Sequence, residues 1–148
     1  MSTPLTLSFG SDHAGLALRR DLMTALRAQG HTILDRGTET EASCDYPDYA
    51  HAVGADVTAG RAQFGILVCN TGIGISIAAN KVPGIRAALV QSADAAELSR
   101  RHNNANVLCL GAKYVDLPLA LACCEAFLRA PFEGGRHDRR VAKLESGG

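Results

Sequence analysis

The apolar positions of this chain fall into short continuous runs that alternate with longer segments of helical period. The runs predict five β-strands, which cover residues 5–9, 32–34, 64–69, 86–90 and 107–110. Between them, apolar residues recur every three or four positions, which is typical of one face of an α-helix. These segments predict helices over residues 15–28, 47–58, 93–102 and 117–128, a short helix ending near residue 81, and a last helix over about 138–144.

The third run, residues 64–69, is apolar throughout, as expected of a strand covered on both faces. Alternating strands and helices favour a parallel sheet with helices on both sides. Right-handed crossovers then bring the carboxyl ends of all strands, and any ligand, to one edge of the sheet. The pattern leaves the strand order open. Because no repeat, low-complexity segment or linker interrupts the chain, we expect a single domain over residues 1–148.

Composition excludes several classes of function. The chain has 148 residues with 15 Lys and Arg against 15 Asp and Glu, so no basic excess is available to neutralise nucleic-acid phosphates. Aromatic residues make up 5% and tryptophan is absent, which also argues against stacking on single strands. No apolar run reaches the roughly 18 residues of a membrane span. Since the first residues lack the pattern of a secretory signal, we expect a cytoplasmic protein without membrane or nucleic-acid partners.

The cysteines argue against disulfides and zinc. Their number is odd, no C-x-x-C pair occurs, and no His/Cys cluster has zinc spacing, so we expect no metal. Three of them lie in apolar runs and are expected to be buried and inert. The five are Cys44, Cys69, Cys109, Cys123 and Cys124.

Polar residues follow the strands at the expected ligand edge. Residues 10–15 follow the first strand, 69–74 the third and 91–92 the fourth. The cluster at 102–106 instead precedes the fifth strand and so belongs at the opposite edge. It could join a site at the first edge only if a partner chain supplied it.

The segment after the third strand carries the clearest chemistry. Gly72 and Gly74 lie at a strand-to-helix turn, where free N–H groups and the helix dipole can hold an anion. A turn that needs glycine for positive φ is an equally good interpretation. Cys69 ends the strand beside this turn, where the helix N-terminus would stabilise a thiolate and make it a usable base. The alternative is a small core residue, but the neighbouring Thr71 and glycines favour the functional interpretation.

Other candidates have both a structural and a functional interpretation. Asp12 is either a helix N-cap or a group in the edge crevice, and His13 beside it could donate to a phosphate. His102 and Asn103 end a helix, where the dipole alone favours a histidine. Tyr46 lies in a long loop, from which a hydroxyl could reach a sugar.

The tail, residues 131–148, is polar and basic. Arg136 and Arg140 are four residues apart, so on a helix they share a face and could clamp a phosphate. The alternative is a solvated surface. A tail that carries phosphate ligands must pack at a site or an interface, in its own chain or a partner's.

These stretches together resemble the type B ribose-5-phosphate isomerase family, which includes the galactose-6-phosphate isomerase subunits. The resemblance spans residues 5–142 in order and without large gaps. Its matching stretches are residues 10–15, 45–50, 65–81, 84–87, 99–103 and 133–137.

The resemblance implies a Rossmann-like three-layer α/β/α sandwich and a homodimer, or a tetramer, with active sites between subunits. It also implies aldose–ketose isomerisation of a sugar phosphate without a metal or organic cofactor. Carried over by position, the family's roles make Cys69 the base and Thr71 a partner in proton transfer. The backbone from Asn70 to Gly74, including Gly72, would bind the enediolate. The other implied roles are ring opening by Asp12 and His102, sugar contacts by Tyr46 and Asn103, and phosphate binding by His13, Arg136 and Arg140.

Asn70 departs from the glycine that this family often has at this position. A side chain there could change the sugar end of the pocket, so ribose 5-phosphate is the default substrate, with allose, galactose or tetrose phosphates as alternatives. A different class remains open as well, a nucleotide-binding module of flavodoxin-like shape without catalysis. That alternative leaves Cys69, His102 and the tail arginines without a role.

Overall fold

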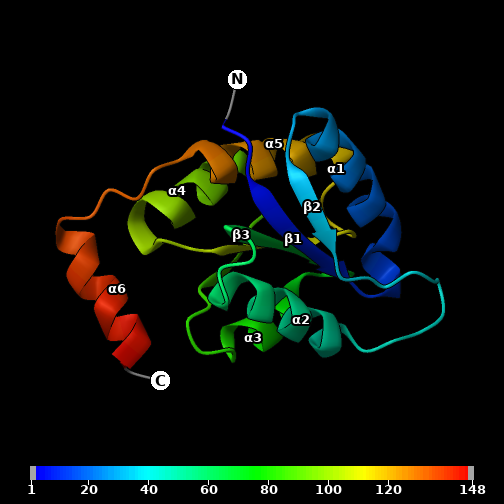
Figure 1. Ribbon diagram of the computed structural model, residues 1–148, viewed down its shortest axis with the longest axis horizontal. Coiled ribbons are helices and arrows are strands. Elements are labelled where there is room, and N and C mark those ends of the chain that lie inside the picture. The colour runs from blue at the N-terminus through cyan, green and yellow to red at the C-terminus, as the bar shows by residue number, and fades with distance from the viewer. Residues whose placement is uncertain (1–2, 147–148) are drawn as a thin grey trace.

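The computed structural model describes residues 3–146, and its centre is a five-stranded parallel sheet (Figure 1). The strand order, which the sequence left open, is β2-β1-β3-β5-β4. All five strands expected from the apolar runs are present. They are β1 (Thr6–Ser11), β2 (Thr32–Asp35), β3 (Phe64–Cys69), β4 (Ala87–Leu89) and β5 (Val107–Gly111).

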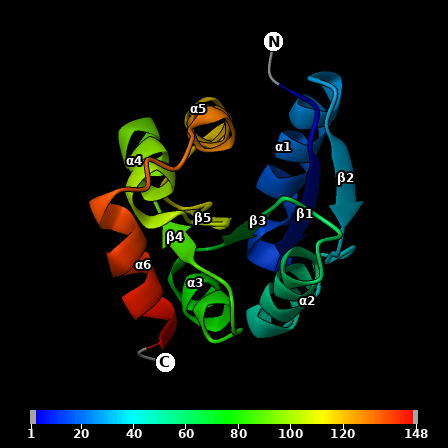
Figure 2. The same ribbon diagram turned by 60° about the vertical axis from the view of Figure 1, so that its left-hand side comes forward.

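Helices cover both faces of the sheet, which confirms the expected three-layer α/β/α sandwich (Figures 1 and 2). One layer holds α1 (Leu16–Ala28), α4 (Ala93–Asn103) and α5 (Leu117–Arg129). The other holds α2 (Tyr46–Thr58) and α3 (Ile73–Asn80). Within residues 3–146, none of these helices combines the length and apolar character that a bilayer crossing requires.

The central strand β3 contributes to the apolar core on each face of the sheet. Ile66 and Val68 are buried with the side chains of α1, α4 and α5, whereas Leu67 and Cys69 are buried with those of α2 and α3. Alternate residues of a strand point to opposite faces, so a strand buried on both sides must be apolar at every position.

The last helix, α6 (Arg136–Ser146), lies outside both layers, beside α4 and the β4 edge of the sheet (Figure 2). The sequence predicted this helix but placed its start about two residues late. Gly134 and Gly135 adopt positive φ angles of 67° and 59°, which end the preceding extended chain. The helix therefore begins directly after them.

A buried carboxylate joins three segments on the α2 side of the sheet. Asp56 accepts hydrogen bonds from Ser8 at 2.7 Å, from Arg36 at 2.6 and 2.9 Å and from Arg61 at 2.8 Å. Burial alone would raise the pKa of Asp56, but these bonds outweigh it and lower the pKa to about 2. The charge of Asp56 is thereby kept in the folded protein.

The sheet has a switch point where β1 and β3 lie side by side. After β1 the chain passes into α1 on one face, and after β3 it passes into α3 on the other. The two connections diverge and leave a crevice at the carboxyl edge, which is where open α/β sheets bind ligands.

Candidate active site

The switch point brings the first two polar segments together, as the sequence predicted. Ser11 of β1 pairs with Val68 of β3, so the next residues, Asp12 and Cys69, are neighbours across the crevice. Packing there is close, because a Cβ on Gly15 would lie 2.5 Å from the carbonyl oxygen of Val68. Asp12 is buried and its Oδ1 accepts the N–H of Gly15 at 3.1 Å. The structure therefore gives Asp12 its N-cap role and places it beside Cys69 as well.

Cys69 is held by the turn that follows it. Its Sγ accepts the backbone N–H of Gly72 at 3.2 Å, and the residue is 4% exposed. Gly72 is the N-cap of α3 with φ of 79°, and a Cβ there would lie 2.5 Å from Leu89. A backbone N–H donor and the N-terminal end of α3 therefore both face this sulfur. Gly72 therefore has two functions, the turn itself and the support of the thiol.

The first turn of α3 supplies N–H donors at this edge. The N–H of Ile73 donates to Thr71 Oγ1 at 3.2 Å, and that of Gly72 is used by Cys69. Among residues 3–146, no acceptor takes the N–H groups of Gly74 and Ile75. Orphan donors of this kind form an anion site at a helix start.

Tyr46, at the start of α2, leans over the same turn. A Cβ built on Gly74 would lie 2.5 Å from Cζ and 2.7 Å from Oη of Tyr46. Only glycine leaves room for this ring, which is 38% exposed. The structure thus places the Tyr46 hydroxyl beside the first turn of α3, and it gives Gly74 a packing reason.

His13 lies at the mouth of the crevice. Its Nδ1 accepts the N–H of Cys44 at 3.3 Å, and the Cys44 Sγ lies 3.8 Å from the same nitrogen. With Nδ1 occupied as an acceptor, the neutral ring carries its proton on Nε2. That nitrogen is then a hydrogen-bond donor.

Asn70 is exposed, and its carbonyl oxygen accepts the N–H of Lys113 at 2.9 Å. A Cβ on Gly111 would lie 2.4 Å from the Thr71 carbonyl oxygen, so the segment after β5 runs directly against the candidate loop. None of the candidate residues taken from the sequence lies in this segment. The rule that ligands bind beyond the carboxyl ends of strands, applied to the fifth strand, would have pointed to Lys113.

Four of the candidate residues lie at the opposite edge of the sheet. For His102 and Asn103 the sequence predicted this position. His102 and Asn103 end α4, and Val107, four residues after Asn103, pairs with Gly65 at the start of β3. Gly65 and Cys69 are four positions apart on β3, about 13 Å along the strand, so the end of α4 lies toward the opposite end of β3 from Cys69. Arg136 and Arg140 lie on α6, both exposed, on the same side as His102.

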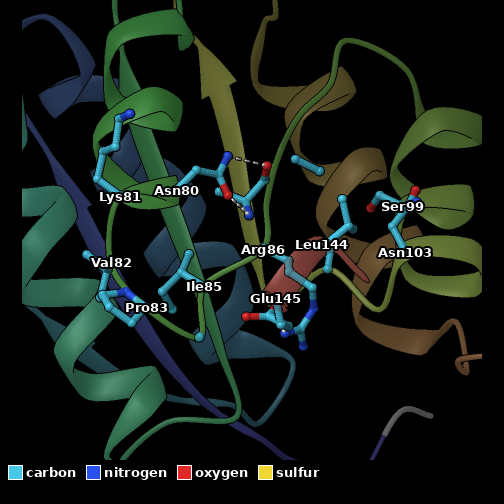
Figure 3. Close-up of a pocket in the computed structure, with 14 residues that line it drawn as sticks. Asn80, Lys81, Val82, Pro83, Ile85, Arg86, Ser99, Asn103, Leu144 and Glu145 are labelled. Atoms are coloured by element: carbon cyan, nitrogen blue, oxygen red, sulfur yellow. Dashed lines mark hydrogen bonds and ion pairs between the residues drawn. The ribbon is translucent and has the colours of Figure 1, made fainter. Parts of the chain in front are cut away.

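A cavity on the side of these four residues, the second group of candidates, does not include Cys69 in its lining. Its volume is about 730 Å³, and it opens between α6 and the connection from α3 to β4 (Figure 3). An ion pair between Arg86 and Glu145, with a 2.6 Å N–O distance, crosses it. Of the second group of candidate residues, Asn103 is the one that lines the cavity.

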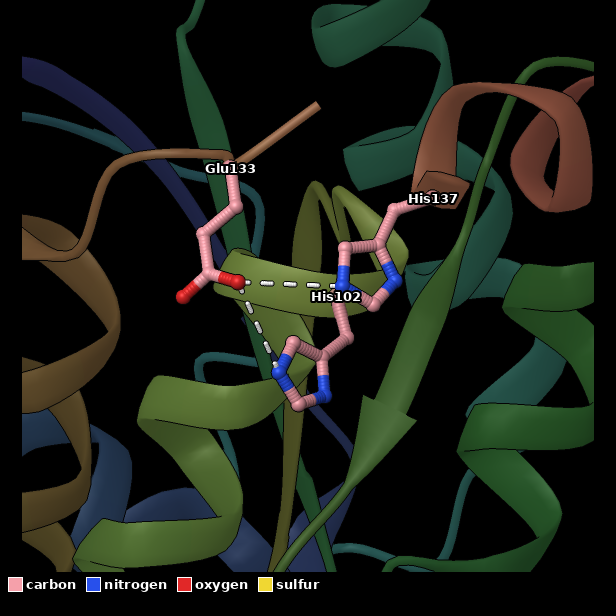
Figure 4. Close-up of side chains that lie close together, drawn as sticks. All are labelled: His102, Glu133 and His137. Carbon is pink, nitrogen blue, oxygen red and sulfur yellow. Dashed lines mark ion pairs between the residues drawn. The ribbon is translucent and has the colours of Figure 1, made fainter. Parts of the chain in front are cut away.

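A trio of metal-ligand types occurs in that second group. His102, Glu133 and His137 have ligand atoms within 4.8 Å of one another (Figure 4). The imidazole rings are stacked, with centroids 4.5 Å apart and planes 12° apart. An imidazole binds a metal in its ring plane, so two stacked rings do not converge on one ion. The trio fits a hydrogen-bonding role better than a metal site.

The remaining cysteines differ from Cys69. Cys109, Cys123 and Cys124 are fully buried, as expected, and burial raises the pKa of each thiol. Such thiols are inert at neutral pH.

The chain is similar to known proteins over nearly its whole length. A family model described as Ribose/Galactose Isomerase matches residues 7–144. Ribose-5-phosphate isomerase B of Escherichia coli (strain K12) is 45% identical over 138 residues, 93% of each chain. The structure of Clostridium thermocellum ribose-5-phosphate isomerase B has a TM-score of 0.94 and 46% identity, covering 95% of both chains.

A further similar structure is a complex with a sugar phosphate. Ribose-5-phosphate isomerase B from Mycoplasma genitalium, with bound ribulose-5-phosphate, has a TM-score of 0.91 and 41% identity. The match covers 96% of this chain and 95% of that one. With a family model over almost the whole chain and relatives above 40% identity, this protein belongs to the ribose/galactose isomerase family.

Proposed function

We propose that this protein interconverts ribose 5-phosphate and ribulose 5-phosphate through an enediolate, with Cys69 as the base. The observation that carries the proposal is the contact between the Cys69 Sγ and the Gly72 N–H at 3.2 Å, at a helix start in the crevice of the sheet. Family membership supplies the reaction class. The contact supplies a sulfur held at the helix start, where a base can reach the substrate carbon.

The chemistry needs one base and a place for negative charge. In the open-chain aldose the Cys69 thiolate takes the proton from C2, and the electron pair forms the C1–C2 double bond of the enediolate. The charge that develops on O1 is stabilised by the N–H groups of Gly74 and Ile75, and losing one such donor typically costs about 3 kcal/mol. Return of the proton to C1 gives the ketose, while Thr71 helps to move the remaining proton between the two oxygens.

The sugar and phosphate contacts follow from placement. Asp12, next to Cys69, serves ring opening, and Tyr46 contacts the sugar from above α3. His13, with its donor on Nε2, binds the phosphate at the mouth of the crevice. Such remote binding holds C1 and C2 against the base.

We further propose a homodimer in which each active site draws on both chains. His102 and Asn103 lie toward the opposite edge of the sheet from the Cys69 of their own chain, and α6 with Arg136 and Arg140 begins beside His102. A partner's crevice would bring its sugar to His102 and Asn103 and its phosphate to the two arginines. The surface of α3 supports such contact, because Ile73 and Ile77 are 50% and 56% exposed and lie on one helical face.

The single-domain organisation and a cytoplasmic location, where sugar phosphates are metabolised, belong to the same proposal. Dimers could pair further into tetramers. Asn70 is exposed at the loop beside Cys69, where its side chain would border the sugar, so other aldose phosphates are the alternatives to ribose 5-phosphate.

The test is a substrate panel with the purified full chain. The protein is incubated separately with four sugar phosphates, and formation of each ketose is followed by NMR. The four are ribose 5-phosphate, allose 6-phosphate, galactose 6-phosphate and erythrose 4-phosphate. Ribose 5-phosphate should give the highest kcat/KM. A higher kcat/KM for another sugar phosphate would change the assigned substrate but not the reaction class. No turnover of any of the four sugar phosphates, together with binding of a nucleotide, would contradict the proposal.

A further inference from the structure

The Glu133 carboxylate faces two histidines that come from different helices (Figure 4). Its Oε1 lies 3.8 Å from Nε2 of His102, at the end of α4, and 3.7 Å from Nε2 of His137, at the start of α6. The proposed function gives His102 a part in ring opening but leaves Glu133 and His137 without a role.

The chain holds the carboxylate in this place. The backbone N–H of Glu133 donates to the carbonyl oxygen of Arg101 at 3.0 Å, which fixes the loop against the end of α4. Oε2 of Glu133 lies 3.7 Å from the Arg101 guanidinium, which is itself held by Glu97 at 2.8 Å. One carboxylate oxygen therefore faces an arginine and the other faces the histidines.

His137 is placed as a neutral platform for the His102 ring. It is 6% exposed, its Nε2 has no hydrogen-bond partner among the described residues, and its ring stacks on His102. Burial lowers the pKa of His137, and the charges of His102, Arg136 and Arg140 lower it further, against Glu133. The buried ring of His137 thus supports the His102 ring beside the Glu133 carboxylate.

We propose that Glu133 is a positioning residue for His102, holding the Nε2–H of that ring so that Nδ1 is the nitrogen presented to the sugar. This inference rests on the proposed function, in which His102 opens the sugar ring. The second nitrogen of His102 already points away from the carboxylate (Figure 4). A carboxylate on one imidazole nitrogen fixes the tautomer and sets the other nitrogen free as a proton acceptor.

The 3.8 Å separation is longer than a charge-assisted hydrogen bond. Catalytic hydrogen bonds are often long before the substrate arrives and shorten in the complex. The His102 side chain is 38% exposed and so has room for the small rotation that closes the gap, while stacking on His137 keeps the ring in plane.

Ring opening has simple proton requirements. The bond between C1 and the ring oxygen O4 breaks, the C1 hydroxyl loses its proton and becomes the aldehyde oxygen, and O4 gains a proton. No proton is consumed overall, so an oriented imidazole can take or give the proton at its Nδ1 and be restored by the second group, which is Asp12 in the proposed site.

The substrate pair separates this step from isomerisation. Ribose 5-phosphate closes into a furanose through O4 and must be opened. Ribulose 5-phosphate cannot form a furanose, because the required O5 carries the phosphate. Exchange of the C1 proton of ribulose 5-phosphate with deuterated water therefore needs the base and the enediolate site but no ring opening.

The experiment compares both reactions in Glu133→Gln, with Glu97→Gln as the matched control. Among the described residues Glu97 forms an ion pair only with Arg101 and faces no histidine. Glu97→Gln therefore removes a carboxylate charge beside the same arginine without affecting a histidine contact. Glu133→Gln should lower kcat/KM for ribose 5-phosphate by about tenfold to a hundredfold, the effect of losing a charge-assisted hydrogen bond. Exchange at C1 of ribulose 5-phosphate should change less than about twofold, and Glu97→Gln should leave both rates near wild type.

His102→Asn serves as the reference and should show the same selective loss. His137→Phe keeps the stacked ring and should retain most activity, so it distinguishes a platform from a proton carrier. Equal loss of both reactions in Glu133→Gln, or no loss in either, would overturn the inference while leaving the proposed function intact. Absence of both reactions in the wild-type chain would instead overturn the proposed function itself.

Discussion

The ring of Tyr46 occupies the space where a side chain on Gly74 would stand, with 2.5 Å between the Tyr46 Cζ and a Cβ built on Gly74. This close approach puts the Tyr46 hydroxyl at the first turn of α3. Tyr46 and the N–H donors that follow Cys69 therefore border the same part of the crevice.

Gly74→Ala should therefore push Tyr46 out of place and lower kcat/KM by about tenfold, with a modest loss of stability. The measurement is a double-mutant cycle with Tyr46→Ala. If the glycine matters because of the ring, Gly74→Ala should cost little more once Tyr46 is gone. Additive losses would mean that the methyl group acts on the helix start and not through Tyr46.

The buried carboxylate of Asp56 predicts a pH dependence of stability. Its pKa is about 2 in the folded protein against 3.8 for the unperturbed group, so the folded state is favoured whenever Asp56 is charged. The contribution to the free energy of unfolding is about 2 kcal/mol above pH 4 and is lost as the pH falls toward 2.

Urea unfolding of the wild type and of Asp56→Asn over pH 7 to 2 checks this. The variant should be less stable at pH 7, and the two free energies of unfolding should converge at low pH. A difference that stays constant with pH would show that the cost comes from the shape of the site and not from its charge.

Much of this architecture follows from local pattern. The apolar run at 64–69 identified β3, and the residues after it identified Cys69 and the glycine turn, because strand ends and ligand edges coincide in parallel sheets. The strand order could not be read, since it depends on which strands pack together. Glu133 and His137 were matched by resemblance but received no role, because the contact of both with His102 exists only after α6 packs beside α4.

The last helix illustrates the limit of periodicity. Its start at Arg136 is set by two glycines with positive φ rather than by the apolar pattern, which is weak in this basic segment. On the observed helix Arg136, Arg139 and Arg140 are all exposed, so exposure does not decide which arginine binds phosphate.

Arg140→Ala should lower kcat/KM for ribose 5-phosphate about tenfold to a hundredfold, since a charge-assisted contact to a dianion is lost. The slow reaction of unphosphorylated ribose should be unchanged. Arg139→Ala is the control, because Arg139 lies three residues from Arg136 and could compete for the same role. Greater damage from Arg139→Ala would assign the phosphate contact to the other side of α6.

If each active site draws residues from both chains of a dimer, two inactive variants should restore activity when they are mixed. Cys69→Ala and Arg136→Ala chains, each nearly inactive alone, should regain activity on mixing, because some mixed dimers hold one intact site. Subunit exchange is verified by native mass spectrometry of chains of different mass. Proven exchange without recovery would place Cys69 and Arg136 in the same site of one chain.

The most direct test of the account is the C1 proton exchange of ribulose 5-phosphate by Cys69→Ala, measured by NMR in deuterated water beside Cys109→Ala. Cys109 lies on the neighbouring strand in the same apolar cluster, and burial raises the pKa of its thiol, so its loss should leave exchange intact. Cys69→Ala should slow exchange by about a hundredfold to ten-thousandfold while inorganic phosphate still binds, because the base acts on carbon and not on the phosphate. Exchange at the wild-type rate in Cys69→Ala would contradict the central claim and assign the proton transfer to another group.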